Sequence, residues 1–192
     1  SRRAEFASLV FESKVWNFGV FVGASVASET TAAMVGDVGV VRRDPMAMKP
    51  FCGYNFGDYW AHWLSFTERT DKLPKIFHVN WFRQDEDGKF IWPGFGENLR
   101  VLRWIIDRVE GRAHGRETPI GFLPDAADID TTELDIDAAT MRKLTTINPL
   151  SWSQEMAAIG EYLETFGDRV PEALWEEQRR IKEELDAVEW PR

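Results

Sequence analysis

The segment 80–98 constrains the fold of this chain more than any other stretch. It contains five large aromatic residues in the sequence NWFRQDEDGKFIWPGFGEN, at positions 81, 82, 90, 92 and 95. The turn sequence Asp-Glu-Asp-Gly at 85–88 divides the segment and a Pro-Gly-Phe-Gly loop follows, which predicts a β-hairpin and then a tight bend. Rings beside glycines leave backbone groups accessible next to π faces. This combination suits a flat ligand such as a nucleobase, which stacks on rings and is recognised along its edge by amides.

The same rings have a simpler interpretation as ordinary core, which composition alone favours slightly. Two features favour a ligand instead. Gly94 and Gly96 flank Phe95 and would let the backbone approach a bound group closely. A helix predicted to begin near Asn98 would offer unpaired N–H groups to a carbonyl edge or an anion. The residues by themselves leave both interpretations open.

The remaining patterns predict an α/β fold with a mixed sheet and flanking helices. The apolar run 19–27, bounded by glycine, is typical of a buried strand. Aromatic residues at helical spacing predict an amphipathic helix over 55–66, capped by Asn55. Further strands are expected at 75–83, 89–92 and 120–123, and further helices from Asn98 to Val109 and in two segments between 151 and 188. The acidic stretch 125–137 is expected to be an irregular, solvated loop, because its spacing misses the EF-hand pattern.

Charge and composition exclude several classes of function. A net charge of −9 opposes nonspecific binding to nucleic acid or to an anionic membrane. The single cysteine, Cys52, excludes an internal disulfide, and no apolar run approaches the roughly 20 residues of a membrane span. We therefore expect a cytoplasmic protein. The three histidines form no HExxH motif, and the sequence has no GxSxG or GxxxxGK[ST] motif. His78 is expected to be structural, and any phosphate cradle would lie elsewhere.

Two further segments each allow two interpretations. The stretch from Ser28 to Gly39, SETTAAMVGDVG, has small residues and no aromatic ring. It is either a lid that opens at little cost or a helical turn capped by Ser28. The Arg2-Arg3 pair is either a solvated terminus or a guanidinium fork on a phosphate.

Several long motifs, in order along the chain, resemble the carboxy-terminal part of the GTP-dependent phosphoenolpyruvate carboxykinases, especially the bacterial form. They are GVFVGASVASETTAA, RRDPMAM, PFCGYNFGDYWAHWL, LPKIFHVNWFR and GKFIWPGFGENLRVL. The resemblance implies an enzyme of gluconeogenesis that interconverts oxaloacetate and GTP with phosphoenolpyruvate, CO₂ and GDP. It also implies an active-site Mn²⁺, a second divalent metal such as Mg²⁺ on the nucleotide, and a monomer.

The resemblance also assigns roles to residues. Guanine would lie between the rings of Phe82, Phe90 and Phe95, with Trp92 in the same motif. The side chain of Asn98 and neighbouring backbone such as that of Gly96 would contact the guanine edge. Arg2 would contact the transferred phosphoryl group. Residues 28–41 would form the lid, with Ser28, Glu29, Thr30, Thr31, Ala32 and Ala33 at its start.

The resemblance has gaps as well. Val26-Ala27 stands where some members have Met-Arg. The metal ligands of the family are expected upstream of this chain, so none is assigned here, and the isolated chain is expected to be inactive. Residues 1–192 would then form one carboxy-terminal nucleotide-binding lobe, with the lid at 28–41, the guanine-binding hairpin and loop at 75–98, and terminal helices at 151–190. The competing hypothesis is a non-catalytic acidic interaction module that uses exposed Trp and Phe as anchors.

Overall fold

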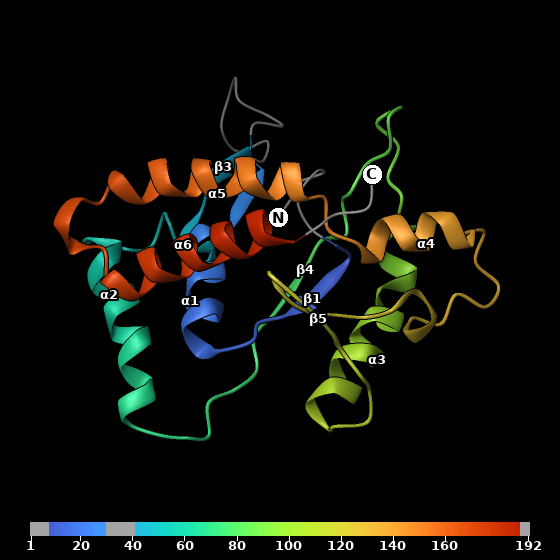
Figure 1. Cartoon of the computed structure of the whole chain (residues 1–192), viewed down its shortest axis with the longest axis horizontal. Helices are drawn as coiled ribbons and strands as arrows, with labels where there is room; N and C mark the ends of the chain where they lie inside the picture. The colour runs from blue at the N-terminus through green and yellow to red at the C-terminus, as the bar shows by residue number, and fades with distance from the viewer. Residues whose placement is uncertain (1–7, 30–40, 189–192) are drawn as a thin grey trace. The chain divides into compact units, whose positions relative to one another are not determined.

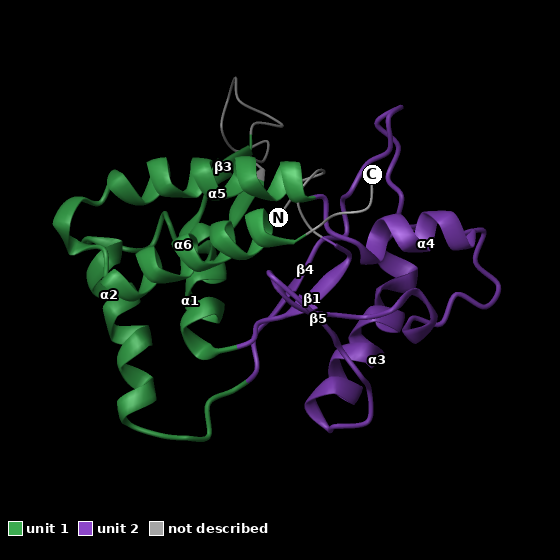
Figure 2. Ribbon diagram, viewed as in Figure 1, with its two compact units in different colours: residues 1, 15–74, 149–192 green, residues 2–14, 75–148 purple. Residues whose placement is uncertain are grey.

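The computed structural model describes residues 8–29 and 41–188, shown in Figure 1. The chain divides into two compact units (Figure 2). We call the described residues 15–29, 41–74 and 149–188 the helical unit and the described residues 8–14 and 75–148 the sheet unit. Each unit is described by itself. No helix in the described part of the chain has both the length and the apolar character that a membrane span requires.

The helical unit is built on four α-helices and a short antiparallel β-ribbon. The helices are α1 (Trp16–Ser25), α2 (Phe56–Leu64), α5 (Pro149–Glu164) and α6 (Glu172–Ala187), and strand β2 (Ala27–Glu29) pairs with β3 (Val41–Arg43). Helix α1 packs against both α2 and α6. The predicted cap of α2 is confirmed, because the Asn55 side chain accepts a hydrogen bond from the Gly57 N–H at 2.7 Å.

The strand predicted over 19–27 is wrong, because most of this run forms helix α1. Phe18, Val20, Phe21 and Ala24 of this helix are all buried. A helix that is buried on several sides is apolar all round, so it lacks the periodicity that identifies an amphipathic helix. A short apolar run of this kind is indistinguishable from a buried strand by pattern alone.

The sheet unit contains a four-stranded sheet in the order β4-β1-β6-β5. Its strands are β1 (Val10–Glu12), β4 (Phe77–Val79), β5 (Arg116–Thr118) and β6 (Gly121–Leu123), and its helices are α3 (Asn98–Val109) and α4 (Ala138–Thr145). The α/β class with flanking helices is confirmed, and every pairing between the described strands is antiparallel. The core consists of Leu9, Val10, Trp92, Val101, Trp104, Ile129, Met141 and Leu144.

The apolar residues of α3 predict a buried stripe of Val101, Leu102, Ile105, Ile106 and Val109, and the face that the helix buries differs from it. Val101 is buried as expected, but Leu102, Ile106 and Val109 are exposed. Trp104 takes the core position instead, at 2% exposure, with its ring 6.2 Å from that of Phe77. The larger indole therefore decides which side of the helix faces the sheet.

The segment 75–98 is less regular than the predicted hairpin. Only Phe77–Val79 joins the sheet, and the return strand is reduced to one bridge between Gln84 and Phe90. Asn80 explains the early end of the strand, because its side-chain oxygen accepts from the Phe82 N–H at 3.1 Å and so forms a local turn. The tight turn itself is present at 85–88, where Gly88 has a φ of +76°.

Candidate functional site

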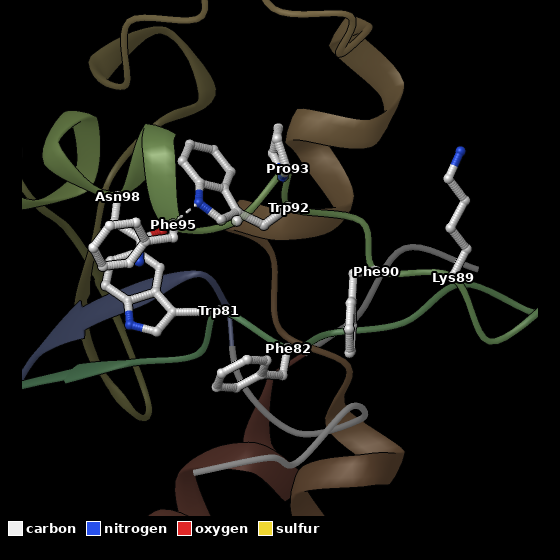
Figure 3. Close-up of a pocket in the computed structure, with 9 residues that line it drawn as sticks. Trp81, Phe82, Lys89, Phe90, Trp92, Pro93, Phe95 and Asn98 are labelled. Atoms are coloured by element: carbon white, nitrogen blue, oxygen red, sulfur yellow. Dashed lines mark hydrogen bonds between the residues drawn. The ribbon is translucent and has the colours of Figure 1, made fainter.

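A pocket of about 660 Å³ lies in the sheet unit, along the segment between β4 and α3. Trp81, Phe82, Lys89, Phe90, Trp92, Pro93, Gly94, Phe95 and Asn98 line it (Figure 3). Its volume falls within the range of small-molecule sites, roughly 300–1,000 Å³. The irregular hairpin and the bend after it therefore bring the predicted aromatic residues together around one cavity.

The phenylalanine rings of this pocket are not sealed in a core. Phe95 is 95% exposed and Phe90 is 41% exposed. Phe82 and Phe90 meet edge to face, with their ring centroids 5.8 Å apart and an interplanar angle of 65°. The pocket thus offers accessible ring faces to a planar ligand, and the interpretation of these rings as ordinary core is wrong for Phe90 and Phe95.

The bend that carries Phe95 depends on Gly94. Gly94 has a φ of +104° and a ψ of −152°, and its carbonyl accepts from the Glu97 N–H at 3.0 Å. This hydrogen bond closes the 3₁₀ turn Phe95–Glu97, which leads directly into α3. Side chains with a Cβ rarely adopt such a backbone conformation. The glycine therefore holds Phe95 outward, beside the pocket.

A substitution at this bend tests its role. We expect Gly94→Ala to lower the free energy of unfolding by about 1–3 kcal/mol, because Ala is strained at this φ. Gly96→Ala is the matched control, since a Cβ there would meet no atom within 4 Å and Gly96 has no positive φ. Urea denaturation of the two variants measures the difference. Equal stabilities would contradict the role of Gly94.

Trp92 and Asn98 form the polar side of the pocket. Trp92 is only 1% exposed and belongs to the core of the sheet unit, yet its Nε1–H donates to Asn98 Oδ1 at 2.9 Å. Asn98 is the first residue of α3, and its backbone N–H donates to the Phe95 carbonyl. Buried Trp92 offers no open ring face for stacking. It instead holds the amide that faces the cavity.

Several site residues differ from the sequence prediction. Gly96 is not among the residues that line the pocket, whereas Trp81, Lys89 and Pro93 are, although they were not assigned as site residues. Figure 3 shows the Lys89 side chain extending away from the rings. Membership of the same aromatic segment was the only signal that could have identified these residues.

The predicted phosphoryl contact and most of the predicted lid lie outside the described residues. These are Arg2, Thr30, Thr31, Ala32 and Ala33. Ser28 and Glu29 belong to strand β2, so the alternative of a helix capped by Ser28 is wrong. The Ser28 hydroxyl donates to Asp44 Oδ2 at 2.8 Å across the β-ribbon. Within the described ranges no group of three or more His, Cys, Asp or Glu side chains could hold a metal ion.

A protein-family model matches most of the chain. The family model described as the phosphoenolpyruvate carboxykinase C-terminal P-loop domain matches residues 1–184. The chain belongs to the GTP-dependent phosphoenolpyruvate carboxykinase family. The 192 residues of this chain do not contain the phosphate-loop motif GxxxxGK[ST]. The chain therefore corresponds to a part of the family domain outside that motif.

Curated relatives agree with the family assignment. The GTP-dependent phosphoenolpyruvate carboxykinase of Neocallimastix frontalis is 50% identical over 190 residues, which cover 97% of this chain. The enzymes of the same name from Chlamydia trachomatis and Paenarthrobacter aurescens are 49% and 48% identical, and each alignment covers 96% of the chain. The chain spans about 31% of the length of each of these relatives.

Proposed function

We propose that this chain is the guanine-binding part of a GTP-dependent phosphoenolpyruvate carboxykinase, a decarboxylating lyase. The whole enzyme would convert oxaloacetate and GTP to phosphoenolpyruvate, CO₂ and GDP in gluconeogenesis. The observation that carries the proposal is the aromatic pocket between β4 and α3, found in a chain of this family. The competing hypothesis of a non-catalytic interaction module has no support from relatives that are named as enzymes.

The chemistry of the pocket fits a purine base. Accessible rings of Phe90 and Phe95 offer π faces, and each stacked base gains roughly 1–3 kcal/mol from such contacts. The Asn98 amide supplies a hydrogen-bonding group at the same cavity. An apolar slot with few polar groups is the usual form of a site that binds a flat heterocycle. GTP and GDP are the ligands that the family name suggests.

We place the other elements of the active site by the family resemblance. Residues 1–192 would be the carboxy-terminal lobe, with a lid at 28–41, the guanine-binding hairpin and loop at 75–98, and terminal helices at 151–190. Arg2 would contact the transferred phosphoryl group, where a guanidinium stabilises charge on the oxygens. The described residues do not fit a Mn²⁺ or Mg²⁺ site, so no metal-dependent step is assigned to them. A cytoplasmic, monomeric enzyme is the form we propose.

Removing the ring of either hairpin phenylalanine tests the base site. In a full-length carboxykinase carrying this sequence, Phe82→Ala or Phe90→Ala is expected to weaken GDP binding by about 1–3 kcal/mol, through lost stacking. Isothermal titration calorimetry measures the change. Phe51→Ala is the control, because Phe51 is 82% exposed, lies in the helical unit and does not line the pocket. Unchanged GDP affinity in both hairpin variants would count against the proposed function.

A further inference from the structure

We propose that Trp92 is a positioning residue that makes the pocket prefer 6-oxopurines, such as guanine, over 6-aminopurines, such as adenine. It would act through Asn98, by fixing which end of the Asn98 side-chain amide faces the base. This inference rests on the proposed function, because it assumes that a purine occupies the pocket.

The hydrogen bond between these residues determines the amide orientation. The indole Nε1–H of Trp92 can only donate, so its partner in Asn98 must be the amide oxygen. The 2.9 Å contact joins Trp92 Nε1 to Asn98 Oδ1. The Nδ2 group of Asn98 therefore keeps its two N–H donors, for which the described residues offer no acceptor. The oxygen and nitrogen of an asparagine amide are usually hard to distinguish by shape. Here the indole, which can only donate, determines that the oxygen faces Trp92.

The packing around this bond keeps the orientation fixed. Trp92 is 1% exposed and lies in one cluster with Val101 and Trp104 of α3. The Asn98 backbone is held at the start of α3 by its hydrogen bond to the Phe95 carbonyl. If the amide turned over, its NH₂ group would face the indole N–H, and that buried donor would lose its acceptor. The pocket therefore presents a donor to the ligand and cannot readily present an acceptor.

The two purine classes differ at the position that such a donor would contact. Guanine carries the acceptor O6, whereas adenine carries the donor N6–H₂ at the equivalent carbon. The fixed Nδ2 donor can form a hydrogen bond with guanine O6. Opposite adenine it would face N6–H₂, which is also a donor, so no hydrogen bond would form. A site built to hydrogen-bond one group discriminates strongly against an analogue that leaves its polar group unpaired. An asparagine free to rotate would accept from N6–H₂ and would lose this selectivity.

Binding of GDP, IDP and ADP to the full-length enzyme tests the proposal. IDP keeps O6 but lacks the 2-amino group, so it isolates recognition at O6. In Trp92→Phe the affinity ratio of GDP to ADP is expected to fall at least about tenfold, equivalent to ~1.4 kcal/mol, and the ratio of IDP to ADP by a similar factor. A purely structural role for Trp92 would weaken all three nucleotides equally and leave both ratios unchanged, which would overturn the proposal.

A second variant leaves the core intact. Asn98→Asp retains an acceptor for the Trp92 indole but presents an oxygen to the base in place of the NH₂ group. The preference should shift toward ADP by at least about tenfold, again ~1.4 kcal/mol, and the added charge near the diphosphate cancels in the ratio of two diphosphates. An unchanged ratio in Asn98→Asp would overturn the proposal even if Trp92→Phe failed to fold.

A double variant tests the route of action. If Trp92 acts through Asn98, then Trp92→Phe should not change the GDP to ADP ratio further in an Asn98→Ala background, because coupled residues are non-additive. An additive change would overturn the proposal. Failure of the proposed function would look different, since the unmodified enzyme would then bind GDP and ADP equally or bind neither.

Discussion

Replacing Arg108 with Met is expected to lower the free energy of unfolding by about 3–5 kcal/mol, the typical loss when one partner of a buried ion pair is removed. The Arg108 Nε–H donates to Glu12 Oε2 at 2.6 Å, and the Glu12 side chain is only 5% exposed. Lys75 Nζ lies 2.8 Å from the other Glu12 oxygen, so part of the compensation would remain. The loss should therefore fall near the lower end of that range.

Arg103→Met on the same helix is the matched control. The Arg103 side chain is 73% exposed and forms an i,i+4 pair with Asp107. Exposed pairs of this kind contribute about 0.3–0.5 kcal/mol. Chemical denaturation of both variants measures the contrast. Similar losses for Arg103 and Arg108 would show that the burial of Glu12 does not set the strength of its pair.

This ion cluster matters for the proposed base site because of the elements that it joins. Glu12 ends β1, Lys75 precedes β4, and Arg108 lies in the last turn of α3. The pocket segment runs from the end of β4 to the start of α3. The cluster thus ties together the two elements that hold the ends of this segment. A loosened cluster is expected to lower nucleotide affinity without any change in the rings.

In the aromatic segment 80–98, the sequence predicts the local turns and the set of rings but not how deeply each ring is buried. Turn residues at 85–88 and glycines around Phe95 identified a hairpin, a bend and a set of rings, and the structure gathers most of them around one pocket. Local chemistry was sufficient here because the turn and the bend are short-range features. The depth of each ring was not predictable. Trp92 and Phe95 have similar sequence surroundings, but they are 1% and 95% exposed.

Errors arose where long-range packing decides the outcome. Helix α1 was predicted as a strand because its burial on several sides removes the helical period. The buried face of α3 was misjudged because Trp104, rather than Leu102 and Ile106, meets the sheet. The bond from Trp92 to Asn98 spans six residues and joins a loop to a helix start, so no periodicity reveals it. Contacts of this kind become visible only in three dimensions.

The free energy of unfolding is expected to fall by about 3 kcal/mol as the pH drops from about 6.5 to about 4, because of His78 in β4. Burial lowers the pKa of His78 from 6.5 to about 4. His78 lies opposite Phe11 across the β1–β4 pair, with ring centroids 5.1 Å apart. Each unit of pKa difference corresponds to about 1.4 kcal/mol, which gives the expected total.

The direction follows from proton binding in the two states. Between the two pKa values the unfolded chain binds a proton at His78 and the native chain does not, so stability decreases as the pH falls. The stability that neutral His78 provides is fully present above pH 6.5.

Denaturation midpoints at several pH values measure how steeply the free energy of unfolding changes with pH. His78→Phe should flatten the curve between pH 4 and 6.5, because it removes the group whose pKa differs between the two states. A His78→Phe curve as steep as the original would mean that another group in the chain takes up the proton.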